Sequence, residues 1–271
     1  MNHYLIIFFL VVSGFTSGIV QNNHKDRLTV ALTIPEKPGT LEIELVYGHI
    51  HVKGYTGKEI IIDAASTGEL LSRTNESNSK GMKRIDGGNP LGLLAEEENN
   101  HIKVSTNSAF MPVNLTIRVP QRMSLKLRTY DKGDIMVENV IGNMEVDNTT
   151  GSITLTNIGG SVVANTYNGR LQASFQPGRL TKPMAFSSMG GQIDIACPAS
   201  LKANVKVKSE RGEVFSDFDI AKSQTKTVYS DDSGRKRTTL DDWLHGRING
   251  GGPEIMIKNY YGNIYLKKSP K

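Results

Sequence analysis

Cysteine is almost absent from this chain of 271 residues, since Cys197 is the only one. A single thiol forms no internal disulfide, which excludes the small scaffolds that disulfides hold together. Aromatic residues are also scarce, at 7% of the chain, and Trp243 is the only tryptophan. The sequence contains no Walker-type phosphate loop, no HExxH zinc motif and no GxSxG nucleophile elbow, so no motif identifies an enzyme class.

Charge of one sign is not concentrated anywhere. The chain has 32 Lys and Arg against 27 Asp and Glu, a net charge of +5, and the basic residues are spread along it. Nucleic-acid binding calls for a basic stripe or a known module, so we predict no nucleic-acid partner. A mild positive charge is compatible with attraction to anionic glycans or lipids.

Long apolar runs are missing except near the amino terminus, where Leu5 to Val12 is uninterrupted. The run has the length of a signal-peptide core and is short for a membrane span, and the small residues Thr16 and Gly18 follow it. We therefore predict a signal peptide over residues 1–18. The mature protein is expected to be exported, in the periplasm, at the cell surface or secreted, with no stable membrane span.

Glycine is plentiful, and it repeats. Between Tyr130 and Ser174 a glycine begins a similar phrase every nine residues, as in GDIMV from Gly133 and GSITL from Gly151. The third and fifth residues of each phrase are mostly apolar, and this alternation is typical of a strand with one buried face. Related phrases begin at Gly48, Gly191, Gly212 and Gly262. We attribute the glycines to bends that need positive φ, and expect Asn139, Asn148 and Asn157 either to cap corners or to be ordinary turn residues.

The period predicts an all-β fold, and two topologies remain open. In a β-solenoid or β-roll-like repeat, units two apart stack in parallel, with about eighteen residues per turn. In an antiparallel meander or sandwich, successive units pair as hairpins. The fixed phase of the glycine favours the solenoid. We expect residues 19–271 to form a single β-repeat domain, with a mobile loop at about 67–91 and an insert at about 220–252.

Few side chains are candidates for chemistry. His49 and His51 share a strand face without an evident third ligand, and Gly250 to Gly252 has the character of a turn, so neither a metal nor a cofactor is predicted. Cys197 is expected in the core. Glycoside hydrolysis needs two facing carboxylates, and sequence does not show such distances. The acids on or beside strands are Asp134, Glu138, Glu145, Asp147, Asp194 and Glu213.

The insert at about 220–252 is the most plausible contact segment. Arg235, Arg237 and Trp243 are its candidate partner-contact residues, because exposed tryptophan beside charge is a common binding anchor. The alternative is that Trp243 folds back and caps an open end of the core.

Three segments resemble a known family: KPGTLEIELVYGHIHVKGYTGKEIIIDA, the Gly-x-Ile-x-Val series, and the ending INGGGPEIMIKNYYGNIYLKK. The chain is similar to exported bacterial β-strand-repeat, adhesin-type domains of unknown function. The resemblance implies an all-β solenoid-like domain outside the cytoplasm and no assigned activity. We therefore expect a non-catalytic binding or scaffold protein of the cell envelope, whose partner is an envelope or extracellular protein or a glycan. The alternative is a polysaccharide-active enzyme.

Overall fold

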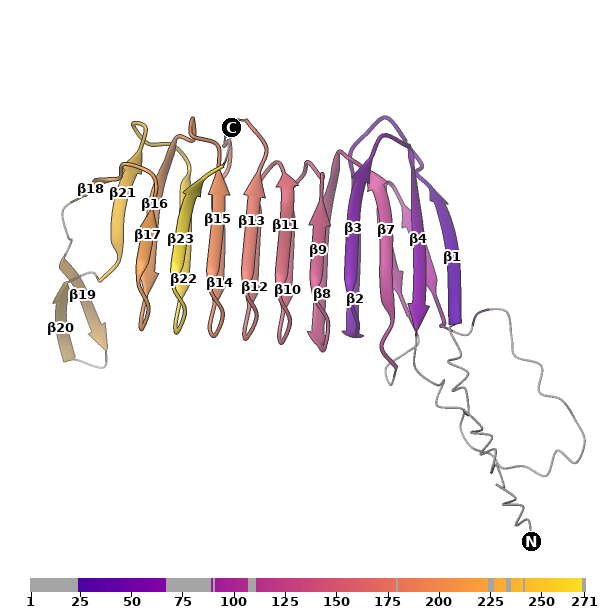
Figure 1. The fold of residues 1–271 in the computed structure, drawn as a ribbon, viewed down its shortest axis with the longest axis horizontal. Coiled ribbons are helices and arrows are strands. Elements are labelled where there is room, and N and C mark those ends of the chain that lie inside the picture. The colour runs from indigo at the N-terminus through magenta and orange to yellow at the C-terminus, as the bar shows by residue number, and fades with distance from the viewer. Residues whose placement is uncertain are drawn as a thin grey trace, which may run out of the picture.

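A computed structural model describes residues 24–66, 89, 91–106, 111–178, 180–223, 227–232, 235–240 and 242–269. The expected signal peptide and nearly all of the expected loop at 67–91 lie outside these ranges. The regular structure within them is entirely β, in two long sheets and one separate hairpin. Figure 1 shows the strands side by side along the long axis of the molecule.

The first long sheet, here called sheet A, runs in spatial order from β1 (His24–Ala31) to β17 (Val214–Ser216). Between them lie β4 (Glu59–Ser66), β7 (Asn114–Pro120), β3 (Ile50–Tyr55), β9 (Ile135–Glu138), β11 (Ile153–Ile158), β13 (Leu171–Phe175), β15 (Ile193–Cys197) and β23 (Ile264–Lys268).

The second long sheet, sheet B, runs from β18 (Ala221–Lys222) to β5 (Leu94–Glu98). Between them lie β21 (Leu244–Ile248), β16 (Ala203–Ser209), β22 (Glu254–Asn259), β14 (Met184–Ser188), β12 (Val162–Thr166), β10 (Met144–Asn148), β8 (Met123–Asp131), β2 (Gly39–Tyr47) and β6 (His101–Ser105). The separate hairpin consists of β19 (Thr227–Asp232) and β20 (Arg235–Leu240).

From β8 to β15 the chain alternates between the sheets, so each of these strands pairs in parallel with the strand two units away. Ile153 of β11 lies opposite Ile135 of β9 on one side and Leu171 of β13 on the other. This pairing confirms the β-solenoid, and the antiparallel meander is wrong for the central repeat. We call a sheet B strand with the sheet A strand that follows it a coil. Antiparallel pairs occur at the ends of the stack and in the separate hairpin.

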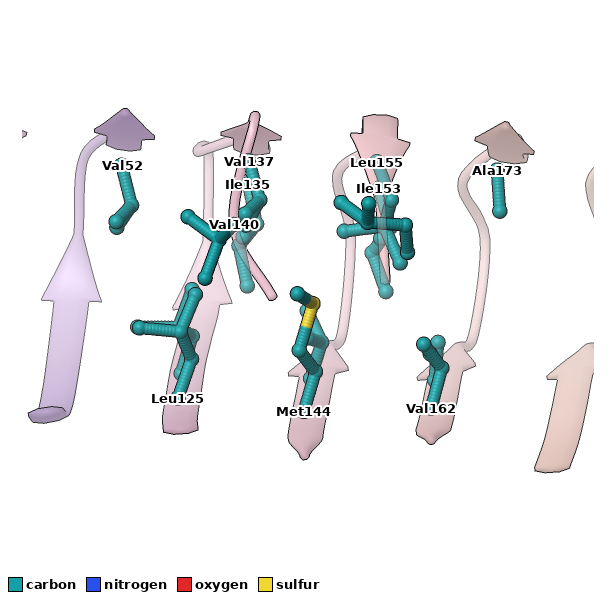
Figure 2. Packing of buried hydrophobic residues seen from close by; sticks show 14 of the residues in the cluster. Val52, Leu125, Ile135, Val137, Val140, Met144, Ile153, Leu155, Val162 and Ala173 are labelled. Atoms are coloured by element: carbon teal, nitrogen blue, oxygen red, sulfur yellow. The ribbon is translucent and has the colours of Figure 1, made fainter. Parts of the chain in front are cut away.

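The core lies between the two sheets. Leu125, Met144 and Val162 from sheet B face Val137 and other apolar residues from sheet A, as Figure 2 shows. The third and fifth residues of the phrases from Gly48 to Gly191, and of the phrase from Gly262, are fully or almost fully buried, as the alternation predicts. In the phrase from Gly212, at the end of sheet A, Val214 and Ser216 are instead exposed. Complete burial of one such aliphatic side chain stabilises the fold by about 1.5–3 kcal/mol.

The first and last coils are not at the ends of the stack. Coil β2–β3 lies between coils β6–β7 and β8–β9, and coil β22–β23 lies between coils β14–β15 and β16–β17. Figure 1 shows the yellow strands β22 and β23 between orange neighbours. The last coil therefore packs on both faces, although it is close to the carboxyl end of the chain.

One row of glycines lies where sheet B strands turn into sheet A strands, and we call it the glycine corner. A Cβ on Gly151 would lie 1.8 Å from the carbonyl oxygen of Gly133, and one on Gly169 would lie 1.8 Å from that of Gly151. The same contact recurs across all coils from β2–β3 to β16–β17. In spatial order the corner consists of Gly48, Gly133, Gly151, Gly169, Gly191, Gly262 and Gly212.

A ladder of polar side chains stabilises this corner. The last inward residue of each sheet B strand from β8 to β16 in spatial order donates a hydrogen bond of 2.7–3.3 Å to the glycine carbonyl of a neighbouring coil, as Asn148 does to Gly133. All but the first also accept one from the glycine N–H three residues later, as Asn148 does from Gly151 at 2.9 Å. The ladder is Thr129, Asn148, Thr166, Ser188, Asn259 and Ser209.

Our reason for the glycines is wrong for most of the corner. Gly48 has a φ of 117°, but the other corner glycines are outside the positive-φ region. The cause is the close approach of the neighbouring coil, which leaves no room for a Cβ. Asn148 caps its corner by side-chain hydrogen bonds to the backbone, as one of the two expectations had it. Asn139 and Asn157 have positive φ, of 56° and 53°, and their side chains hydrogen-bond to each other at 2.6 Å.

Candidate binding groove

The groove is on the outer face of sheet B. Its volume is about 620 Å³, and it spans the coils from β8 to β22. Its floor is a row of outward residues that the strand register places opposite one another: Arg128, Asp147, Asn165, Ser187 and Lys258.

Hydrogen bonds join most of this floor. Asp147 accepts a hydrogen bond of 3.1 Å from Arg128 Nη2 and one of 3.0 Å from Asn165 Nδ2. Ser187 donates to Asn165 Oδ1 at 2.7 Å. The hydrogen bond to Asp147, and then that to Tyr130, raises the pKa of Arg128 above its ordinary value. The floor thus offers a fixed series of donors and acceptors along the stack.

One wall of the groove consists of the residues that follow the polar ladder. Backbone hydrogen bonds continue one residue beyond the strands, for example from Tyr167 N to Asn148 O at 3.1 Å and from Tyr260 N to Ser188 O at 3.2 Å. The wall residues therefore stack in register. From coil β8–β9 to coil β22–β23 they are Tyr130, Thr149, Tyr167, Met189 and Tyr260.

The tyrosines differ in how they are held. Tyr130 is 40% exposed and donates a hydrogen bond of 2.5 Å to Glu44 Oε1. Tyr260 is half-buried, meets Tyr261 edge to face at 4.6 Å, and lies 5.5 Å from the guanidinium carbon of Arg211. Tyr167, in the middle, is 52% exposed. Such amphipathic rings are common in binding surfaces because they offer a large apolar face with a polar tip.

The predicted contact residues lie beyond one end of this groove. Trp243 is half-buried, with Lys206 Nζ 4.6 Å from its ring centroid, and Asp242 forms a 2.6 Å ion pair with Lys208. Lys206 and Lys208 are on β16, next to β22. Trp243 thus lies on the groove's side of sheet B and does not line the groove. The end of the core is instead covered by the buried Phe218 and the partly buried Ile220 and Leu244, next to β16 and β17.

Arg235 and Arg237 are both in β20, opposite Asp232 and Ser230 of β19. Their side chains are outside the part of the chain that is described. Their contact with a partner stays a prediction.

The acidic residues do not gather in one place. Asp134, Glu138, Asp194 and Glu213 belong to sheet A or its turns, whereas Glu145 and Asp147 are on β10. Most have structural partners: Glu138 lies 2.8 Å from His51 Nε2, and Asp194 is bound by Arg170 and Lys267. Of the described residues that line the groove, only Asp147 carries a carboxylate.

The other residues considered for metal binding or catalysis, His49 and Cys197, lie in surroundings that suit a structural role. His49 Nδ1 accepts a hydrogen bond of 2.9 Å from the backbone N–H of Asp134. Across the described ranges, no three His, Cys, Asp or Glu side chains come close enough to hold a metal ion. Cys197 is buried as predicted, and burial raises the pKa of its thiol to about 12.

No helix in the described ranges is long and apolar enough to cross a bilayer.

Sequence reasoning missed the groove. It treated the outward positions of the strands as a surface without a site, and it did not consider Tyr130, Tyr167 and Tyr260 together. A signal was present, because each of these tyrosines directly follows the Thr or Asn that ends the inward series of its strand.

Comparisons with solved structures find distant likenesses. A "putative cell adhesion protein" from Clostridium sporogenes is 10% identical, with a TM-score of 0.43, over 91% of this chain and 100% of that one. A "putative adhesin" from Parabacteroides distasonis is 7% identical, with a TM-score of 0.33, over 92% and 98%. A "putative lipid binding protein" from the same species is 9% identical, with a TM-score of 0.30, over 92% and 97%. Likenesses this distant say nothing about what the present chain binds.

Among curated proteins, no sequence matches the chain. The model of one protein family, described as Toastrack DUF4097, matches residues 7–241. That match covers most of the chain and agrees with the stack of short strands. The chain therefore belongs to the Toastrack DUF4097 family.

Proposed function

We propose that this protein is a non-catalytic glycan-binding protein, with an adhesin-like role at the cell envelope, and that the groove on sheet B holds the glycan. The observation that carries the proposal is the combination of a row of hydrogen-bonding side chains with a wall that includes three tyrosines. Sugars present both hydroxyl groups and apolar C–H faces. The floor matches the hydroxyls with donors and acceptors, and tyrosine rings match the C–H faces.

Two observations support a non-catalytic role: Asp147 is the one carboxylate among the described residues that line the groove, and Glu44, further along the same row, is hydrogen-bonded to Tyr130. Hydrolysis of a glycosidic bond uses two carboxyl groups, about 5–5.5 Å apart in retaining enzymes and about 6.5–9.5 Å apart in inverting ones. Asp147 in addition accepts hydrogen bonds from Arg128 and Asn165, so its carboxylate already has structural partners.

A glycan array with the purified mature protein tests the proposal. We expect binding to at least one glycan class, lost in a Tyr167→Ala variant and kept in a Phe215→Ala variant. Phe215 is a matched control because it is also an exposed aromatic residue, 44% exposed, but is on sheet A. No glycan bound above background, or equal loss in both variants, would contradict the proposal.

Export is part of the same proposal, with residues 1–18 as the signal peptide. The apolar run from Leu5 to Val12 supports it. Sequencing the amino terminus of the protein recovered from outside the cytoplasm should show that residues 1–18 have been removed. An intact Met1 on the recovered protein would contradict it.

Trp243, Arg235 and Arg237 are proposed as a second contact area, for an envelope or extracellular protein. Trp243 supports this proposal because it is on the side of sheet B that carries the groove, and because a half-buried indole over Lys206 leaves part of its ring accessible. Binding to whole cells that is weakened by Trp243→Ala, with glycan binding unchanged, is the expected result. Unchanged cell binding would contradict it.

A further inference from the structure

The tyrosines of the groove wall occur on every second coil. Along the stack, the wall position is occupied by Val46, Tyr130, Thr149, Tyr167, Met189, Tyr260 and Glu210. The second, fourth and sixth of these seven positions are tyrosines, and the other four positions are not. Tyr260 continues the alternation only because coil β22–β23 lies between coils β14–β15 and β16–β17.

This alternation sets a fixed distance between rings. Neighbouring strands of a sheet are about 4.8 Å apart, so tyrosines on alternate coils repeat at about 9.6 Å along the stack. A ligand that contacts all three rings must present the same apolar face at that interval. It must also be extended, because the wall and the floor both run along the long axis of the molecule.

A β-1,4-linked polysaccharide has this property. In its extended form each sugar is turned over relative to the one before, so alternate sugars present the same face to a flat surface. We infer that the groove binds a linear β-1,4-linked polysaccharide along the solenoid axis, with every second sugar stacked on Tyr130, Tyr167 or Tyr260. This inference rests on the proposed function and adds the class of glycan, its direction and its register.

The register predicts a stepped dependence on chain length. A disaccharide engages one tyrosine, a trisaccharide two and a pentasaccharide three. Affinity is therefore expected to rise from disaccharide to trisaccharide, to change little at the tetrasaccharide, to rise again at the pentasaccharide and then to level off. Each stacked ring is expected to strengthen binding by about tenfold.

Calorimetry with chitin and cellulose oligosaccharides, from the disaccharide to the hexasaccharide, tests this on the mature protein. Purified peptidoglycan glycan strands form a third arm, because they have the same β-1,4 linkage and a different source. Binding in any arm with the two steps supports the inference. Absence of binding in all three arms overturns it, even if the glycan array finds another ligand and the proposed function stands.

Two variants separate register from simple aromatic content. Tyr130→Ala should remove the step at the pentasaccharide and keep the step at the trisaccharide. The double variant Thr149→Tyr with Tyr167→Thr keeps three tyrosines on the wall but moves the middle one to the neighbouring coil. It should bind the pentasaccharide about as weakly as Tyr167→Thr alone. Wild-type affinity in the double variant, with thermal unfolding unchanged, would overturn the inference.

Discussion

The middle of the stack and its two ends are built from the same coil but are connected differently. From β8 to β15 the coils follow one another in sequence, and each coil after β8–β9 packs on the coil just before it. At the ends, coils β2–β3 and β22–β23 are each inserted between two others. At the carboxyl-terminal end the corner glycines and polar ladder are the same as in the middle, since Gly262 and Asn259 occupy the places that Gly151 and Asn148 occupy there.

The comparison shows that local sequence determines the coil, whereas the order of coils depends on contacts distant in sequence. An inserted coil is stabilised by a neighbouring coil on each face. These two neighbours cannot complete their own packing until the inserted coil has folded between them. A coil in the middle can form as soon as the preceding coil exists, because the chain between them is short. The ends should therefore be the cooperative part of the molecule, and the middle the part that tolerates changes in coil number.

The largest expected effect is the loss of the inserted coil. A chain that ends at Asn249 lacks β22 and β23, so β14 and β16 have no shared neighbour and the buried Ile255 and Ile264 are missing. We expect this truncation to abolish cooperative unfolding of the carboxyl-terminal coils. Urea denaturation followed by circular dichroism, together with limited proteolysis, measures it.

Deletion of residues 142–159 is the matched change in the middle. It removes coil β10–β11 and joins Ile141 to Gly160, which lies one coil further on, so that β12 can stack on β8 in the register of β10. This variant should fold and unfold cooperatively, with a reduced free energy of unfolding. Equal tolerance of both deletions would mean that the inserted coil is no more important than a coil in the middle.

A methyl group at the glycine corner should have the next largest effect. Gly151→Ala places a Cβ 1.8 Å from the Gly133 carbonyl oxygen, and separating the two coils is expected to cost about 3 kcal/mol. Gly178→Ala is the control, because no heavy atom lies within 4 Å of the position its Cβ would take. Equal free energies of unfolding for the two variants would show that the coils are not in close contact at this corner.

Removal of one rung of the polar ladder should cost about 2 kcal/mol. Asn148→Ala leaves the Gly133 carbonyl and the Gly151 N–H without their side-chain partner inside the corner. Asn148→Thr should recover most of the loss, because Thr166 makes both corresponding bonds in the next coil. Chemical denaturation of the two variants gives the difference, and a threonine variant as unstable as the alanine variant would count against the ladder.

The smallest expected effect concerns an ion pair of the inserted coil. Burial disfavours ionisation of Asp194, but hydrogen bonds from Lys267 of β23, Arg170 and Gln192 outweigh it and lower the pKa of the carboxyl group. A lowered folded-state pKa stabilises the fold above the unfolded value of about 3.9, and this contribution is lost as the pH falls through the folded pKa.

Asp194→Asn should therefore destabilise the protein at pH 7 by about 1 kcal/mol and by progressively less below about pH 4. Thermal unfolding of both proteins across this pH range measures the change. A difference that stays constant down to pH 2 would contradict the ionic role of Asp194.

Much of the coil was predictable from the sequence. Alternation identified the buried pairs, such as Ile153 with Leu155, because a strand with one buried face has a period of two. The glycine phrase identified Gly262 and Gly212 as corner residues. The reason that these positions are glycine was not predictable. The contact of Gly151 with the Gly133 carbonyl depends on the distance between coils and not on the φ of one residue.

The place of the last coil and the groove were not predictable. GNIYL from Gly262 resembles the other phrases, so sequence order would put it at the end of the stack, whereas the structure puts it between two earlier coils. The wall position of Tyr260, two coils from Tyr167, depends on that insertion. Trp243 was predicted as a contact residue because it is the only tryptophan in the sequence and lies beside charged residues. Residue type alone, however, does not show which face of the fold carries a groove.

Backbone amide chemical shifts of the protein without residues 1–18, recorded with and without the chitin pentasaccharide, show where the polysaccharide binds. We expect changes concentrated along the wall and floor, at Tyr130, Tyr167, Tyr260 and Lys258, with the amides of the outer face of sheet A unchanged. Changes concentrated at Trp243 and in the β19–β20 hairpin, with the groove amides unaffected, would contradict binding in the groove.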